Sequence, residues 1–274
     1  MKRIKLIVTD MDGTLLNDQS EIGKRDLAEL HRLTNAGIKF TFATGRHPKY
    51  INRFVRMLGV NVPVICANGG VIFDTASGSA LRTSLVPSAT VKAASDFLFA
   101  NNIPFSIHTN AGIDMTKNNP RRLFLEQYNE AAEFPEDRNP VGILLPGHTI
   151  KGVFKISIFC GERLFLKKEL TDLLPKGNLQ LAFSGQGLLD ITSDEAGKGN
   201  ALQWLAQHLQ IERDEIIAFG DNDNDLSMIA AVQHGVAVAN AVEQVKHAAE
   251  YVTLSNQEEG VSYALMHRYS TFLP

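Results

Sequence analysis

The chain has 274 residues, of which 44% are hydrophobic and 21% are charged. The length excludes a disulfide-stapled miniprotein and allows one large domain or two ordinary ones, and the proportions exclude a disordered chain. The formal net charge of −3 gives the chain no overall attraction to nucleic acid or to anionic lipid. We therefore expect neither a nucleic-acid nor a membrane partner.

Cysteine usage and the apolar runs predict a cytoplasmic protein. Cys66 and Cys160 are too few for a disulfide framework or a zinc site, and both lie in apolar, strand-like runs. The apolar run before Asp10 is too short for a signal peptide. The longest run without charge, 57–73, contains Pro, Asn and a Gly pair, which argues against a membrane span.

Strands and helices alternate in the first third of the chain. The run 4–8 is apolar on both faces, which is typical of a parallel strand covered by helices on both sides. Periodicity and Gly positions predict the remaining elements, which are helices over 20–36 and 48–58 and strands over 38–44 and 62–67. A β-α-β-α-β order with ordinary loop lengths predicts a parallel sheet.

The middle of the chain has a different order of predicted elements, in which helices alternate with β-hairpins. Asn110-Ala111-Gly112 splits two short strand-like runs, and a second hairpin surrounds 184–187. The predicted helices are 88–100, 121–132 and 163–174, and the predicted strands are 105–109, 113–116, 153–160, 179–183 and 188–192. This pattern predicts an α+β layer on a mostly antiparallel sheet.

In the last third of the chain, strands and helices alternate again, as they do in the first third. We expect helices over 198–209, from 225, over 242–249 and over 258–268, and strands over 216–219, 236–239 and 251–254. The fold class is therefore α/β, with a Rossmann-like parallel-sheet core and an inserted α+β cap domain. We place the core at 1–84 plus 191–274 and the cap, as a substrate-specificity domain, at 85–190. The two adjacent joining segments, near 84–87 and 191–194, predict a hinge.

Two acidic loops follow strands of the predicted core. Asp10-Met11-Asp12-Gly13-Thr14 comes directly after the first strand, where open α/β sheets bind ligands. Gly220-Asp221-Asn222-Asp223-Asn224-Asp225 follows the strand 216–219. Oxygen ligands from two strand ends suit a hard cation such as Mg²⁺. For the first loop alone, a strand-ending Asx turn is an equal alternative. An EF-hand is excluded for the second, because Leu226 and Val232 occupy positions that require Gly and an acid.

Two further loops are suited to phosphate. Thr44-Gly45-Arg46 ends the strand 38–44, where a hydroxyl and backbone N–H groups can hold phosphate oxygens, although for this loop by itself a plain turn is the favoured interpretation. Gly197-Lys198-Gly199 opens a helix. A lysine is unfavourable at that end of the helix dipole, so a bound anion is the simpler explanation. The spacing is not that of a P-loop.

In chain order, the four loops are 10–14, 44–46, 197–199 and 220–225, and in this order they resemble the four motifs of the haloacid dehalogenase (HAD) superfamily of phosphohydrolases. The place of the insertion, between the second and third motifs, and its helix-and-hairpin pattern resemble the type IIB cap of the Cof-like subfamily. The runs 11–16, 68–70 and 224–228 strengthen the resemblance, which spans nearly the whole chain. One small departure is Gly197, where Ser, Asp or Asn often precedes the motif lysine.

The resemblance implies a Mg²⁺-dependent phosphatase acting on small phosphate monoesters through an aspartyl-phosphate. Asp10 would be the nucleophile and Asp12 the general acid and base. The implied metal ligands are the Asp10 carboxylate, the Asp12 backbone carbonyl and Asp221. The implied phosphate-binding residues are Met11, Thr44, Gly45, Lys198 and Asn224, with Asp225 and Arg46 in support.

Two other functions are compatible with the same loops. A phosphomutase would use the same aspartyl-phosphate and return the phosphoryl group to a sugar, and a non-catalytic protein would only bind a phosphometabolite. His108 and Asn110 on the first cap hairpin are candidates for substrate contact, whereas for His47 a surface position is the favoured interpretation. We expect a small phosphorylated metabolite as the partner.

Overall fold

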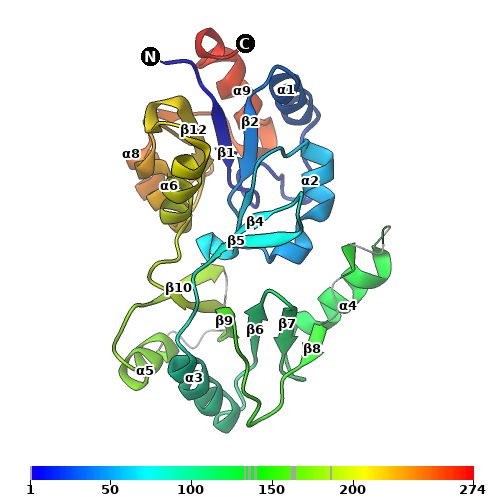
Figure 1. Ribbon diagram of the computed structural model, residues 1–274, viewed down its shortest axis with the longest axis vertical. Helices are drawn as coiled ribbons and strands as arrows, with labels where there is room; N and C mark the ends of the chain where they lie inside the picture. The colour runs from blue at the N-terminus through cyan, green and yellow to red at the C-terminus, as the bar shows by residue number, and fades with distance from the viewer. Residues whose placement is uncertain (1, 133, 135–136, 139–140, 162–164, 186) are drawn as a thin grey trace. The chain divides into compact units, whose positions relative to one another are not determined.

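The computed structural model describes residues 2–132, 134, 137–138, 141–161, 165–185 and 187–274 (Figure 1). Contacts along the chain divide it into two units. The first unit is Met1–Gly45, Arg53–Leu81 and Gly197–Pro274, and the second is Arg46–Asn52 and Arg82–Ala196. The short segment Arg46–Asn52 belongs to the second unit, although the sequence prediction placed it in the core. The functional division into a core and a substrate-specificity cap stays a prediction.

A parallel sheet forms the centre of the first unit. Its strand order is β14-β13-β12-β1-β2, with bounds β1 (Leu6–Thr9), β2 (Lys39–Phe42), β12 (Ile216–Gly220), β13 (His234–Ala237) and β14 (Tyr251–Val252). In the register, Thr9 is opposite both Phe42 and Phe219, so these three strands end level with one another. All four residues of β1 are buried, as its two-sided apolar pattern predicts. The predicted fold class is confirmed.

Helices cover both faces of this sheet (Figure 1). On one face, Leu6 and Val8 share a buried cluster with Leu205 of α6 (Lys198–Leu209), Ile229 of α7 (Leu226–Ala231) and Val245 of α8 (Glu243–Ala248). Helices α1 (Lys24–Asn35) and α9 (Gly260–His267) pack together on the other side. Burial of these apolar stripes, at about 25 cal/mol per Å² of apolar area, is the main stabilising contribution.

Helix α1 begins four residues later than the predicted position 20. Ser20 has φ +59° and its N–H donates to the carbonyl of Asn17, so the chain makes a tight turn there. The Asn17 side chain also accepts from the N–H of Glu21. Because Asn and Ser side chains and backbones readily form such local turns, this segment is a loop and not a first helical turn.

A buried carboxylate, Asp26, joins α1 to α9. Its Oδ1 accepts the N–H of Ser262 at 2.7 Å, and its Oδ2 has no hydrogen-bond partner among the described residues. Burial raises the pKa of Asp26 from 3.8 to about 6, against the opposing effect of the Ser262 hydrogen bond. The ionised form is therefore the unfavourable one in the folded protein.

We expect this carboxylate to make the protein less stable as the pH rises from about 4 to about 6. Because the folded-state pKa exceeds the unfolded value, the folded state binds more protons in that window, and stability is lost as the pH rises through it. The loss is on the order of 2 kcal/mol. Urea unfolding of the wild type and of Asp26→Asn between pH 4 and 8 measures it. An equal pH dependence in both proteins would contradict the assignment.

A small antiparallel sheet follows the core strands and was not predicted in full. It contains β3 (Val64–Cys66), β4 (Val71–Asp74) and β5 (Ser79–Thr83), in that order. β3 was expected in the parallel sheet. It lies beside β2, with a parallel bridge from Ala43 to Ile65 and no regular ladder, and it pairs antiparallel with β4. The expected helix 48–58 is a 3₁₀ turn, Pro48–Tyr50, followed by α2 (Asn52–Leu58).

The second unit contains a six-stranded sheet of order β10-β11-β9-β6-β7-β8. Its bounds are β6 (Phe105–Thr109), β7 (Gly112–Met115), β8 (Val141–Ile143), β9 (Val153–Phe159), β10 (Leu179–Gly185) and β11 (Leu188–Ser193). The pairs are antiparallel apart from β7 with β8, which is a parallel pair formed by a strand that the sequence analysis missed. The predicted α+β character of the insertion is confirmed.

Three helices belong to this unit, namely α3 (Ser88–Ala100), α4 (Arg121–Ala131) and α5 (Leu166–Leu173). Leu98 of α3 and Leu170 of α5 pack on Ile107 and Ile156 in one buried cluster. The predicted start of α5 at 163 lies outside the described residues. Helices α3 and α5 therefore cover this apolar face of the sheet, as expected for an α+β layer, whereas Leu125 of α4 packs with Ile113 and Met115 in a separate cluster.

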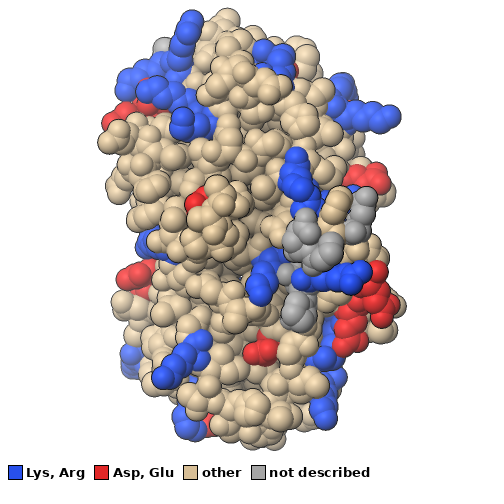
Figure 2. Space-filling view, turned by 45° about the vertical axis from the view of Figure 1, so that its right-hand side comes forward, with Lys and Arg blue, Asp and Glu red and all other residues tan. Residues whose placement is uncertain are grey.

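The surface drawn in Figure 2 mixes charges of both signs. Lys and Arg side chains lie there among uncharged surface and acidic side chains. Within the described ranges, no helix combines the length and the apolar character needed to cross a bilayer.

Candidate active site

Three carboxylates converge at the ends of two neighbouring strands. Asp10 directly follows β1 and Asp221 directly follows β12, and the backbone N–H of Asp10 donates to the carbonyl of Phe219 at 2.9 Å. Asp225 lies one turn beyond Asp221. Each of the three offers a carboxylate oxygen, and these oxygens lie within 4.8 Å of one another. Parallel pairing with level strand ends therefore brings together residues that are more than 200 positions apart in the sequence.

Lys198 is completely buried and lies between two of these carboxylates. Its Nζ is 2.6 Å from Asp10 Oδ1 and 2.6 Å from Asp225 Oδ1. The residue is the first of α6, and the N–H of the next residue, Gly199, donates to Ser227 Oγ at 3.1 Å. The start of α6 is thus tied to the beginning of α7, which fixes the ammonium against both acids.

Burial and charge work against each other in this cluster. Burial alone lowers the pKa of Lys198, but the adjacent carboxylates of Asp10 and Asp225 outweigh it and raise the pKa above its usual range. Burial and the charge of Asp225 raise the pKa of Asp10 well above its usual value, against the opposing effect of Lys198. Burial is also the main cause of the raised pKa of Asp221. Three acids with a single buried lysine leave an excess of negative charge.

Asp225 accepts hydrogen bonds from its own loop as well as from Lys198. Its Oδ2 accepts the backbone N–H groups of Asp221 and Asn222 at 3.0 and 3.1 Å. Asp221 in turn accepts the hydroxyl of Thr14 through Oδ1 at 2.7 Å. Both acidic motifs are therefore held in place by charge-assisted hydrogen bonds, and Thr14 contributes a contact that the sequence analysis did not assign.

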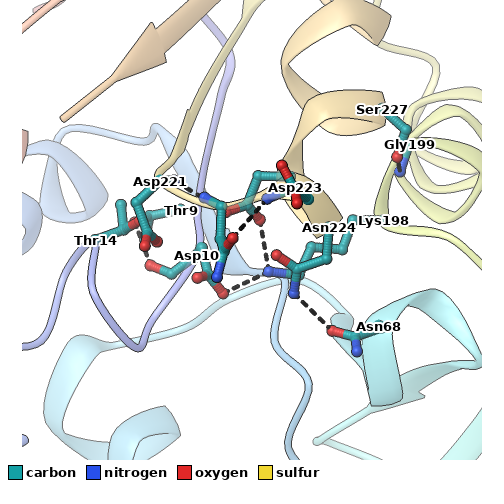
Figure 3. Close-up of polar contacts among 12 residues, drawn as sticks. Thr9, Asp10, Thr14, Asn68, Lys198, Gly199, Asp221, Asp223, Asn224 and Ser227 are labelled. Carbon is teal, nitrogen blue, oxygen red and sulfur yellow. Dashed lines mark hydrogen bonds and ion pairs between the residues drawn. The ribbon is translucent and has the colours of Figure 1, made fainter. Parts of the chain in front are cut away.

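Asn68 links two of the predicted phosphate-binding motifs. Asn224 Nδ2 donates to Asn68 Oδ1 at 3.1 Å (Figure 3), and the N–H of Asn68 donates to the carbonyl of Thr44 at 2.9 Å. A Cβ on Gly45 would lie 3.0 Å from the same Asn68 oxygen. The sequence analysis noted this Asn-Gly-Gly turn but gave Asn68 no role. Asn68 has a left-handed backbone, φ +56°. Asn adopts this conformation more readily than most residues, so an Asn before a Gly pair is the sequence feature that could have indicated a fixed turn here.

The other predicted site residues lie differently. Met11 is fully buried, and its carbonyl accepts N–H groups from the three residues at 14–16, which forms the turn after β1. The Asp12 side chain is exposed and is not part of the carboxylate group. Arg46 belongs to the second unit. Its supporting role stays a prediction, as do the roles assigned to Asp12 and Met11.

Gly69 has a conformation and a neighbour that together require glycine. Its φ is +89°, and a Cβ there would lie 2.2 Å from the carbonyl oxygen of Gly197, the residue before Lys198. Gly37 offers a matched control, because its φ is +94° and a Cβ there would meet nothing within 4 Å. The two positions share the backbone penalty and differ in the steric clash.

We expect Gly69→Ala to destabilise the protein more than Gly37→Ala and to lower its activity. Gly37→Ala should cost about 1–2 kcal/mol, the usual penalty of a left-handed residue with a Cβ. Gly69→Ala adds a clash of about 1–3 kcal/mol and displaces the Lys198 loop. Urea unfolding of both variants, with assays of the phosphatase activity that the sequence resemblance implies, measures this. Equal losses of stability would show that the contact with Gly197 is unimportant.

The residues present suit a divalent cation. All the converging donors are oxygens, with no His or Cys in the described cluster, which favours Mg²⁺ over Zn²⁺. Burial and neighbouring carboxylates raise the pKa values of Asp10 and Asp221, so their ionised forms are unfavourable in this cluster. A bound cation would stabilise these ionised forms. The oxygen donors of this cluster therefore fit a site for a divalent cation.

The fold and these four loops define a class of protein. A family model described as haloacid dehalogenase-like hydrolase matches residues 7–265. The chain belongs to this family and is a HAD-type phosphatase, that is, a phosphoric monoester hydrolase. This confirms the resemblance noted from the four motifs.

Individual relatives agree with that class over the full length. The chain is 32% identical over 280 residues to 5-amino-6-(5-phospho-D-ribitylamino)uracil phosphatase YwtE of Bacillus subtilis (strain 168), covering 95% of this chain and 96% of that protein. It is 28% identical to a haloacid dehalogenase-like hydrolase structure from Bacteroides thetaiotaomicron, with a TM-score of 0.83 over 97% of this chain and 100% of that one. The structure of the HAD subclass IIB sugar phosphatase BT4131 matches with 25% identity and a TM-score of 0.80, covering 97% and 99%.

Proposed function

We propose that the protein is a Mg²⁺-dependent phosphatase that hydrolyses small phosphate monoesters through an aspartyl-phosphate on Asp10. The observation that carries the proposal is the buried Asp10 carboxylate at the end of β1, held at 2.6 Å by the Lys198 ammonium within a group of three acids. A carboxylate in such a fixed position is suited to in-line attack on phosphorus.

The proposed reaction has two steps. An Asp10 oxygen forms a bond to phosphorus while the bond to the ester oxygen breaks, and Asp12 gives its proton to the leaving alkoxide. Asp12 then takes a proton from a water molecule, which attacks phosphorus and releases phosphate and the Asp10 carboxylate. General acid–base catalysis of this kind contributes typically ~10²–10⁴-fold.

The remaining motif residues would bind and orient the phosphoryl group. We assign its oxygens to Lys198, the Thr44 hydroxyl and the N–H groups of Met11 and Gly45, with Asn224 as a further contact. Supporting this, Asn68 hydrogen-bonds to both Thr44 and Asn224 and so couples two of these loops. Asp225 keeps Lys198 in place, because both of its oxygens are engaged in hydrogen bonds. Arg46 is proposed to support the second motif.

We assign the cation to the Asp10 and Asp221 carboxylates and the Asp12 carbonyl. When bound, it supplies positive charge that lets one anion approach another and stabilises the transferring group. Thr14 holds Asp221 at 2.7 Å and so orients one of these ligands.

The substrate class follows from the relatives and the domain organisation. YwtE is named for a phosphoribityl compound and BT4131 as a sugar phosphatase, so we propose a small phosphorylated metabolite here too. Residues 85–190 are the proposed cap, which selects the alcohol part of the substrate. Because the phosphate contacts are the same for every monoester, discrimination requires groups outside the four motifs.

Metal removal provides the direct test. We expect phosphate release from p-nitrophenyl phosphate and glucose 6-phosphate to stop in EDTA and to return with Mg²⁺. Inorganic phosphate and sugar isomers are both measured. Isomerised glucose phosphate without phosphate release would indicate a mutase, binding without either product would indicate a non-catalytic protein, and full activity in metal-free buffer would overturn the metal assignment.

A further inference from the structure

Two asparagine side chains hold the loop that follows β1, and the sequence analysis assigned a role to neither. Asn240 lies after β13, and its Nδ2 donates to the carbonyl of Gly13 at 2.7 Å. Asn256 begins the 3₁₀ turn Asn256–Glu258 after β14, and its Nδ2 donates to the carbonyl of Leu16 at 2.9 Å. All four residues belong to the first unit, so these contacts depend on that unit alone.

The two asparagines are also joined to each other. The backbone N–H of Asn256 donates to Asn240 Oδ1 at 3.0 Å. The Asn240 amide therefore meets a carbonyl on its nitrogen side and an N–H on its oxygen side, so turning it over would lose both hydrogen bonds. Asn256 itself is buried, and so is its contact with Leu16. A chain of amides thus connects the ends of β13 and β14 to the loop after β1.

Asp12 is next to both of the carbonyls that these amides hold. Gly13 directly follows it in the chain, and Leu16 forms an isolated β-bridge with it. The N–H groups of the residues at 14–16 all donate to the carbonyl of Met11, whereas the Gly13 carbonyl accepts from Asn240. Gly13 has φ +92°, and glycine has more backbone freedom than any other residue. Holding its carbonyl therefore restricts the backbone on the C-terminal side of Asp12.

The proposed reaction requires Asp12 to be placed accurately, because its carboxyl group transfers a proton in both steps. Proton transfer needs the two heavy atoms at about 2.6–3.2 Å, and a displacement of about 1 Å can lower a rate about 10²-fold. The Asp12 side chain is exposed, so burial does not hold it as it holds Asp10. The position of the Asp12 carboxyl group therefore depends on the backbone of this turn.

We propose that Asn240 and Asn256 are positioning residues for Asp12, which fix the turn at 12–16 so that the Asp12 carboxyl group reaches the leaving oxygen. This inference rests on the proposed phosphatase function and adds two residues that lie outside the four motifs. Both act through the backbone of the turn. Without them the carboxyl group occupies several positions and protonates the leaving oxygen less efficiently, whereas attack by Asp10, which Lys198 holds at 2.6 Å, is unchanged.

Two substrates of similar size test the proposal with the full-length enzyme and saturating Mg²⁺. Phenyl phosphate has a more basic leaving oxygen than p-nitrophenyl phosphate, so its hydrolysis depends more on the proton from Asp12. We expect Asn240→Ala to lower kcat/KM about tenfold for phenyl phosphate and about twofold or less for p-nitrophenyl phosphate. The ratio of the two kcat/KM values, p-nitrophenyl over phenyl, should therefore rise about fivefold or more, and Asn256→Ala should raise it too. Unfolded enzyme lowers both rates equally, so the ratio does not depend on folding.

Asn61→Ala is a matched control in the same unit. Asn61 Oδ1 accepts the N–H of Phe40 at 2.9 Å, and its Nδ2 donates to the carbonyl of Ile38 at 3.2 Å. These contacts lie at the start of β2, whereas Asp10 lies level with its end. The variant therefore loses the same kinds of hydrogen bond away from the turn at 12–16, and its ratio should equal that of the wild type.

The ratio in each variant decides the inference. An unchanged ratio in Asn240→Ala or in Asn256→Ala would overturn the role assigned to that residue, and so would an equal loss with both substrates, which indicates a displaced cation site instead. Asp12→Asn separates this result from the proposed function. If Asp12→Asn leaves the ratio at the wild-type value, Asp12 is not the general acid and the proposed function fails at that step. If it raises the ratio and the asparagine variants do not, the positioning inference alone fails.

Discussion

Replacing Asp10 by Asn should reduce phosphate release by on the order of 10³-fold or more, because the amide cannot form the acyl phosphate that the proposed mechanism requires. Of the three clustered acids, Asp10 alone follows β1, and Lys198 holds it there, so neither Asp221 nor Asp225 can replace it as the nucleophile. Steady-state rates with p-nitrophenyl phosphate and Mg²⁺ measure the effect. A substrate with such a good leaving group isolates the attack step from the need for a proton.

Stability should respond much less than activity to this change. Lys198 keeps its 2.6 Å contact with Asp225, and an uncharged side chain at position 10 removes a carboxylate whose pKa is raised mainly by burial. Thermal unfolding of the variant checks this. Asp18→Asn, a change to an exposed acid in the loop that follows, should leave both activity and stability unaltered. Activity above a few per cent in Asp10→Asn would show that the nucleophile lies elsewhere.

Replacing Lys198 by Met should destabilise the protein by ~3–5 kcal/mol as well as inactivate it, because two buried carboxylates then lose their common counter-ion. The lysine is completely buried, so water cannot compensate. Without the ammonium, the pKa of Asp10 rises further above its unfolded value, so the folded state binds more protons. The destabilisation should therefore be largest at alkaline pH and shrink as the pH falls.

Urea unfolding at pH 5 and pH 8 measures this effect, with and without Mg²⁺. Added Mg²⁺ should return part of the lost stability, since a divalent cation can neutralise the acids that Lys198 leaves behind. Lys198→Arg keeps the charge and should lose less stability than Lys198→Met. Lys92→Met, at an exposed pair, should change stability by less than about 1 kcal/mol. A Lys198→Met variant as stable as Lys92→Met would contradict the buried-pair account.

Much of the fold could be predicted from local sequence, and the class of the protein from the resemblance of its four loops to a known family. The two-sided apolar run of β1 and the single stripe of α6 each specify an element, and the predicted bounds of α3 and α6 agree with the structure at every residue. Short elements without periodicity were missed or misplaced. β4 and β8 have four and three residues, which is too few for an alternating pattern to be recognised. β3 belongs to the small sheet and not to the predicted parallel sheet, because the left-handed turn at Ala67–Gly69 reverses the chain and pairs β3 with β4.

By itself, the sequence determined which chemical groups are available: the acids of two strand-end motifs, one helix-opening lysine and the order of the four loops. Tertiary structure decided how these groups are paired. Only the level ends of β1 and β12 bring Asp10 within reach of Asp225, and only the junction of α6 with α7 buries Lys198 between them. Local patterns specify elements through backbone periodicity, whereas charge pairing depends on distances that are fixed only when the elements pack.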